Sequence, residues 1–213
     1  DTLKVILPNF PDAETECLEL PNHPQNPAMG TRKVPLSREL WIEAGDFMED
    51  APKKFFRLKP GGEVRLRGAF IVRCDEVVKD DSGNAVALHC SFDPDTRSGQ
   101  PGADRKVKGT IHWLSAEHAV RAEVRLYDRL FSVPHPAADK DVDFVEHLNP
   151  ESLQVIADAR IEPGVESMAP GTHMQFERTG YFVVDPDSTS DAPVLNRAAT
   201  LRDTWARIEK QLR

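Results

Sequence analysis

The highest concentration of positive charge in the chain lies in residues 53–73. Phe55 and Phe56 stand inside this stretch, and Glu63 is its one acidic residue. Ammonium and guanidinium groups attract phosphates, and aromatic rings stack on unpaired bases. The combination is therefore typical of a surface that binds single-stranded nucleic acid. The basic residues are Lys53, Lys54, Arg57, Lys59, Arg65, Arg67 and Arg73.

Two of these arginines have a spacing that favours contact with base edges. Side chains alternate between the faces of a strand, so Arg65 and Arg67 are expected about 7 Å apart on one face. Val64 and Leu66 would then point into a core. Two planar guanidiniums on a rigid strand can form bidentate hydrogen bonds to bases as well as to phosphates. A solvated outer face of a strand is the alternative interpretation of the same pattern.

A second candidate is the segment MQFER at 174–178. The amide of Gln175 can bind a base edge, and Arg178 can bind a base or a phosphate. Strand alternation places Gln175 and Glu177 on one face and Arg178 on the other, unless a turn at Thr179–Gly180 redirects Arg178. The alternative is an ordinary exposed strand end.

A third candidate is the proline-rich loop at 20–27, with the sequence LPNHPQNP. Its prolines restrict the backbone, and its polar side chains offer donors and acceptors, so the loop could bind a splayed nucleotide at low entropic cost. Pro24 and Gln25 lie at its centre. A plain connection between two strands would have the same composition.

The motifs of common active sites are missing. The sequence contains no P-loop, no G-x-G-x-x-G and no G-x-S-x-G motif, and its histidines lack ligand spacing. Cys17, Cys74 and Cys90 are far apart and form no C-x-x-C pair. We therefore expect no catalytic residue, bound cofactor or metal in this chain. The odd cysteine count without a signal peptide favours the cytoplasm, and no apolar stretch is long enough to span a membrane.

The elements that would position these residues are mostly strands. The chain has 213 residues, 39% of them hydrophobic, and 17 prolines, which disfavour long helices. Its net charge of -8 opposes nucleic-acid binding in general, so any binding must depend on a local basic surface. Period-two alternation predicts strands within 2–7, 15–20, 39–44, 63–74, 84–92, 107–114, 119–127, 153–161 and 174–185.

Many short strands separated by turn signals are typical of closed barrels. Helical spacing is limited to a short stretch at 45–58, which contains Pro52, and to 197–212, where Leu201, Trp205, Ile208 and Leu212 form one stripe. Residues 93–106 and 132–143 are expected to be long loops.

Several segments, in this order along the chain, resemble the anticodon-binding region of bacterial glutaminyl-tRNA synthetases. The matching segments are LPNHP at 20–24, MGTR at 29–32, LWIEAGDF at 40–47, GEVRLR at 62–67, KVKGTIHW at 106–113, RLYDRLF at 125–131, FERTGYF at 176–182, NR at 196–197 and LRDTW at 201–205.

This resemblance implies a mainly β fold of two antiparallel β-barrels, similar to the barrel of a ribosomal protein that binds 5S RNA, with a few short helices and a C-terminal helix. One barrel would combine residues 1–43 with 115–213, and the other would be formed by the inserted residues 44–114. It also implies contacts with the anticodon loop of tRNA(Gln), by Arg65 and Arg67 to the first base, Gln175 to the second and Arg57 and Arg178 to the third. Pro24, Gln25 and Lys54 complete the expected tRNA-binding set.

The catalytic motifs of the family are absent from this chain, which also begins directly in an expected strand. The resemblance therefore implies a fragment that follows a separate N-terminal catalytic domain, where ATP, Mg²⁺ and glutamine would bind. Residues 106–113 are expected to connect anticodon binding to that domain, and the protein is expected to be a monomer.

Two alternatives stay open. The chain could belong to a glutamate-specific relative or to another RNA-binding barrel protein. It could also be a structural module that binds no RNA.

Overall fold

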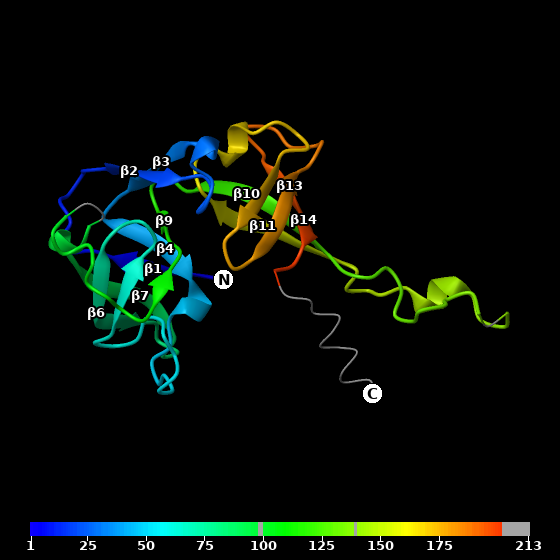
Figure 1. Cartoon of the computed structure of the whole chain (residues 1–213). Coiled ribbons are helices and arrows are strands. Elements are labelled where there is room, and N and C mark those ends of the chain that lie inside the picture. Colours follow the sequence, from blue (N-terminus) through cyan, green and yellow to red (C-terminus); the bar gives the residue numbers. More distant parts are fainter. Residues whose placement is uncertain (98–99, 139, 202–213) are drawn as a thin grey trace. The chain divides into compact units, whose positions relative to one another are not determined.

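The structure is a computed structural model that describes residues 1–97, 100–138 and 140–201 (Figure 1). It is mainly β, which confirms the expected fold class. The chain forms two compact units, Asp1–Ala119 and Val120–Arg213, and each is described by itself.

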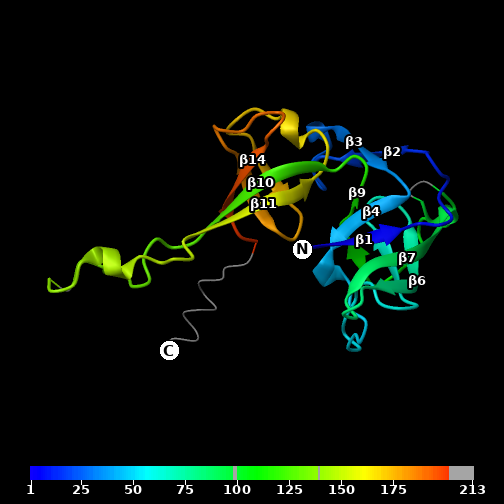
Figure 2. The same cartoon turned by 180° about the vertical axis from the view of Figure 1, so that it is seen from behind.

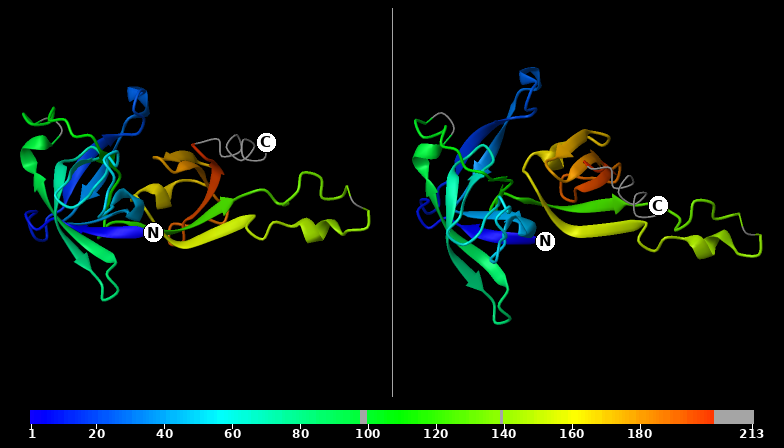
Figure 3. Two further views of the ribbon diagram at one scale, coloured as in Figure 1. Left: turned by 90° about the horizontal axis from the view of Figure 1, so that it is seen from below. Right: turned by 60° about the horizontal axis from the view of Figure 1, so that its bottom comes forward.

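The first unit is built on a seven-stranded sheet that curves into a half-barrel (Figure 3). Its strand order is β8-β5-β6-β7-β1-β4-β9. The pairs β1–β7 and β5–β8 are parallel and the other pairs are antiparallel, so the sheet is mixed. The strands are β1 (Thr2–Ile6), β4 (Glu39–Glu43), β5 (Glu63–Leu66), β6 (Ile71–Lys79), β7 (Ala85–Asp93), β8 (Thr110–Ile111) and β9 (Leu114–Ser115).

A separate hairpin joins β2 (Glu16–Pro21) to β3 (Thr31–Leu36). The sequence pattern did not predict β3, because Pro35 lies within it and proline cannot donate a ladder hydrogen bond. Proline is tolerated here because β3 pairs with a single strand, with Pro35 opposite Cys17.

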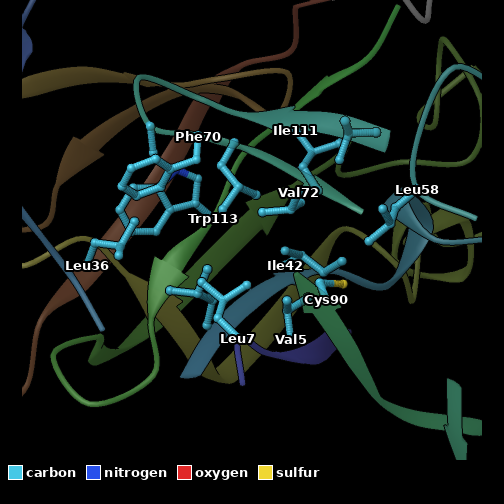
Figure 4. Packing of buried hydrophobic residues seen from close by; sticks show 14 of the residues in the cluster. Val5, Leu7, Leu36, Ile42, Leu58, Phe70, Val72, Cys90, Ile111 and Trp113 are labelled. Atoms are coloured by element: carbon cyan, nitrogen blue, oxygen red, sulfur yellow. The ribbon is translucent and has the colours of Figure 1, made fainter. Parts of the chain in front are cut away.

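The core of the first unit follows from strand alternation. Val5 on β1 and Ile42 on β4 are buried. Leu36 at the end of β3 packs with them, as do Leu7 and Leu58 from connecting segments (Figure 4). The indole of Trp113 is also buried, and its Nε1 donates to the carbonyl of Arg67 at 3.0 Å. That bond fixes the chain just beyond β5 to the segment between β8 and β9.

The second unit has a five-stranded sheet with the order β11-β10-β14-β13-β12. Phe182, Leu195, Val124 and Ile161 are buried in its core. Residues 128–138 and 140–152 extend away from this sheet (Figures 1 and 2). The strands are β10 (Val120–Tyr127), β11 (Leu153–Ile161), β12 (His173–Phe176), β13 (Gly180–Val184) and β14 (Val194–Ala199).

The described helices are short 3-10 turns, and none of them is long and apolar enough to cross a membrane. They are η1 (Pro27–Met29), η2 (Ala44–Asp46), η3 (Pro94–Thr96), η4 (Phe144–His147) and η5 (Val165–Ser167).

Both expected helices need correction. The helix at 45–58 is wrong: beyond η2, the Met48 amide donates to the Leu58 carbonyl at 3.1 Å, so these residues close a loop. The predicted helix at 197–212 is wrong for the residues that the structure describes. Residues 197–199 belong to β14, which pairs with β10 and β13. Residues 202–213 lie outside the described part of the chain.

The strands at the start of the chain pair with strands of the same unit. β1 pairs with β4 on one side and with β7 on the other, within the sheet that contains β5 and β6. The backbone groups of residues 2–6 thus find their partners inside the first unit, as buried backbone requires.

Gly109 marks a close approach of two backbone segments. A Cβ there would lie 2.2 Å from the carbonyl oxygen of Phe56, a contact that backbone atoms cannot relieve by rotation. We expect Gly109→Ala to lower the free energy of unfolding by about 1–3 kcal/mol, as overpacking does. Gly45→Ala is the control, because a Cβ at Gly45 meets nothing within 4 Å. Equal urea midpoints for the two variants would contradict this contact.

Candidate nucleic-acid interface

Residues 47–58 form a closed loop between η2 and β5 that presents much of the predicted basic stretch. Leu58 is fully buried, and its amide donates to the carbonyl of Asp46 at 2.9 Å. The Phe55 amide donates to the carbonyl of Pro52 at 2.9 Å, which makes a tight turn. Lys54 and Phe56 are exposed on this fixed backbone.

Arg57 lies in the same loop and neutralises a buried carboxylate. Its Nη1 donates to the Gly45 carbonyl at 3.0 Å and lies 3.1 Å from Oδ1 of Asp46. The Asp46 side chain is completely buried, whereas that of Arg57 is 42% exposed. A buried carboxylate is stable only when it is paired, so Asp46 holds Arg57 while much of the guanidinium still faces solvent.

Arg65 and Arg67 differ in their surroundings. Arg65 is half-buried on β5, whereas Arg67 is exposed and follows the last residue of that strand. The Arg65 guanidinium donates to the carbonyls of Thr96 at 2.8 Å, Ala103 at 2.9 Å and Arg105 at 3.0 Å. Arg65 therefore fixes the predicted loop at 93–106 to the sheet. The sequence pattern did not predict this structural contact.

The proline-rich loop after β2 is fully exposed, but most of its polar side chains bind its own backbone. Asn22 donates to the carbonyl of Met29 at 2.9 Å, Asn26 accepts from the amide of Ala28 at 3.1 Å, and His23 accepts from the amide of Gln25 at 3.1 Å. These bonds stiffen the loop, so that Pro24 and Gln25 are presented on an ordered backbone.

Close contacts at two glycines bring three of these segments together within the first unit. The carbonyl of Gly109 accepts from the Arg65 amide at 2.9 Å, while Gly109 itself packs against the carbonyl of Phe56. Gly68, next to Arg67, packs against Leu20 at the end of β2, where a Cβ would meet that side chain at 2.3 Å. The structure thus gathers the loop that contains Lys54 and Arg57, the end of β5, and the start of the Pro24–Gln25 loop.

Gln175 and Arg178 belong to the hairpin β12–β13 of the second unit. Gln175 lies in β12 opposite Tyr181, and both residues are exposed. Arg178 has φ of 63° in the turn, closed by a hydrogen bond from the Thr179 amide to the Phe176 carbonyl at 3.0 Å. The turn therefore includes Arg178 itself, one residue earlier than expected.

Two places in the structure shift the pKa of ionisable groups. The backbone N–H of Asp187, with Asn196 and Arg125, lowers the pKa of Asp185. A hydrogen bond between the buried, paired thiols lowers the pKa of Cys74 and raises that of Cys90. Among the described residues, no group of histidine, cysteine, aspartate and glutamate could hold a metal ion.

One contact in this region was missed by the sequence analysis. Nζ of Lys108 lies 5.4 Å from the centroid of the Phe56 ring, over the ring. The two residues come from separate loops, so no spacing in the sequence indicates that they meet.

Two family models with one description match this chain: tRNA synthetases class I (E and Q), anti-codon binding domain. They match residues 1–93 and 110–185. The chain belongs to this family of anticodon-binding domains, which confirms the resemblance found in the sequence.

Its curated relatives include glutamine–tRNA ligases from three bacteria. That of Rhodopirellula baltica is 50% identical over 210 residues, that of Xanthomonas axonopodis pv. citri 54% over 209, and that of Bordetella avium 53% over 208. The matches cover 98%, 97% and 97% of this chain but only 35%, 36% and 35% of the relatives. The chain therefore spans about a third of the length of the curated relatives it matches.

The contacts of Arg65 lead to a stability prediction. Arg65→Met keeps the aliphatic stem but removes the donors to three carbonyls, and unsatisfied acceptors of this kind cost about 1–3 kcal/mol. We expect a lower free energy of unfolding and faster amide hydrogen exchange at Gly102, whose amide donates to Asp95 within the held loop. Arg67→Met is the control. Unchanged exchange at Gly102 would show that Arg65 does not hold this loop.

The backbone conformation of Arg178 leads to a second stability prediction. A left-handed conformation costs a non-glycine residue about 1 kcal/mol, and glycine adopts it freely. We expect Arg178→Gly to keep or raise the free energy of unfolding by up to about 1 kcal/mol, whereas the neighbouring control Thr179→Gly lowers it. Urea denaturation followed by circular dichroism measures both. A clear loss of stability in Arg178→Gly would mean that the side chain contributes more than the strained backbone costs.

Proposed function

We propose that this chain recognises the anticodon loop of tRNA(Gln) as part of a glutamine–tRNA ligase. The observation that carries the proposal is the identity of 50–54% with glutamine–tRNA ligases over nearly the whole chain. The whole protein would attach glutamine to tRNA(Gln) in a reaction that uses ATP and Mg²⁺. Those substrates would bind to the N-terminal catalytic domain, and the protein would act as a cytoplasmic monomer.

The geometry of the first unit supports a nucleic-acid surface at its basic segments. Lys54, Arg57 and Arg67 are exposed there, on backbone that is closed by buried Leu58 and by the Trp113 hydrogen bond. Pre-organised cations cost little entropy to place against phosphates and base edges. Arg57 and Arg67 are proposed to contact bases, Lys54 a phosphate, and Pro24 and Gln25 to border a base pocket.

Arg65, Gln175 and Arg178 complete the proposed set, with different roles. Arg65 orders the loop that contains Thr96 and Ala103, and it offers its remaining donors to the first anticodon base. Gln175 and Arg178 supply the contribution of the second unit, to the second and third bases. The left-handed turn fixes the direction in which the Arg178 side chain leaves the backbone, as strained residues at binding sites often do.

A binding titration tests the proposal. We expect the chain to bind a labelled anticodon stem-loop of tRNA(Gln) more tightly than one with a glutamate anticodon. We also expect the affinity to fall steeply between 50 and 200 mM salt. Arg67→Ala should weaken binding by about 1–3 kcal/mol, the cost typical of a lost base contact.

Lys79→Ala is the matched control, because it removes one positive charge from an exposed residue that pairs with Glu49 on the same unit. Equal affinity for swapped anticodons would refute the specificity for glutamine tRNA. Tighter binding of the glutamate anticodon would assign the chain to a glutamate-specific enzyme, and the absence of binding at low salt would favour a purely structural module.

A further inference from the structure

Phe56 is an exposed aromatic ring in the most basic part of the first unit. The residue is 49% exposed, next to Arg57 and two residues after Lys54. A single exposed apolar residue needs no explanation by itself. Phe56 differs because a cation lies over its ring: Nζ of Lys108 is 5.4 Å from the centroid, and Lys108 is itself exposed.

The backbone that carries Phe56 is fixed on several sides. Its carbonyl packs against buried Gly109, whose own carbonyl accepts from the Arg65 amide at 2.9 Å. The next residue, Arg57, is paired with buried Asp46, and Leu58 after it is fully buried. The ring is therefore presented by a rigid segment, and a partner that contacts it need not order the loop first.

The surroundings of the ring restrict the chemistry of that partner. Lys53, Lys54 and Lys108 are close to Phe56 in sequence or in space, so a cationic or purely apolar ligand would not match their positive charge. An unpaired nucleotide has a planar base that stacks on an aromatic ring and a phosphate that pairs with an ammonium group. Both halves of the Phe56–Lys108 pair thus have a partner in one nucleotide.

We propose that Phe56 and Lys108 form a stacking subsite for one unpaired base of the anticodon loop. The base contacts the Phe56 ring, and the Lys108 ammonium contacts an adjacent phosphate. This subsite rests on the proposed function and adds two residues to its binding surface, with stacking as a different kind of contact from the arginine and glutamine hydrogen bonds.

Substitutions of Phe56 test the stacking contact in the 213-residue chain. We expect Phe56→Ala to weaken binding of the tRNA(Gln) anticodon stem-loop about 5- to 150-fold, the range that corresponds to losing one base–aromatic stack. Phe56→Trp should keep the affinity, because it retains a stacking plane. Phe56→Leu should lose nearly as much as Phe56→Ala, because it retains apolar area without a plane.

Two controls separate stacking from other effects. Val86→Ala removes an equally exposed apolar side chain from β7 and should bind as the unmodified chain does. Lys108→Ala should weaken binding and lower the slope of log affinity against log salt by about one, as expected for a lost phosphate contact. Circular dichroism melts verify that each variant is folded.

The stacked base can be located with 2-aminopurine, whose fluorescence falls when it stacks. We expect strong quenching at one position of the anticodon loop in the unmodified chain and its loss in Phe56→Leu. Suppose that the unmodified chain discriminates anticodons, and that Phe56→Ala and Phe56→Leu bind the stem-loop as tightly as the unmodified chain does. The stacking subsite is then refuted, and the proposed function stands. If the unmodified chain binds no anticodon stem-loop, both proposals fail.

Discussion

The close backbone contact at Gly109 determines how the basic segments of the first unit meet. Its carbonyl accepts the Arg65 amide, which begins the parallel pairing of β5 with β8, and its Cα lies against the carbonyl of Phe56. A side chain at this position would separate the loop at 47–58 from β5. The placement of Lys54, Arg57 and Phe56 beside Arg65 and Arg67 therefore depends on a residue without a Cβ.

A protein with a net negative charge can form a basic surface only if the carboxylates near that surface are buried or paired with cations. The Asp46 side chain is completely buried and forms an ion pair with Arg57. Glu63 forms an ion pair with Arg105 at 2.9 Å. These carboxylates order cations of the region without forming an acidic surface of their own. The net charge of -8 is thus compatible with a local field that attracts phosphates, because charges close to a ligand outweigh distant, screened ones.

The same arginine chemistry has two roles in this fold. A guanidinium has five donors in one plane, which suits backbone carbonyls as well as base edges. Arg65 donates to three carbonyls of one loop, so this side chain orders that loop. At Arg57 both contacts use a single nitrogen, Nη1, and the side chain stays 42% exposed. Proximity in sequence, as between Arg65 and Arg67, does not reveal which role each one has.

The sequence by itself determined the mainly β class, most strands and the family. Period-two alternation and local motifs depend only on residues that are close together in the sequence. The sequence pattern failed at residues 197–199, where pairing with β13 overrides a helical spacing, and at 45–58, where Leu58 closes a loop. Only the tertiary structure decided that Arg65 holds a loop, that Arg178 lies in a left-handed turn, and that Lys108 covers Phe56. Each of these depends on contacts between segments distant in sequence or on a backbone conformation, and residue type and spacing do not specify either one.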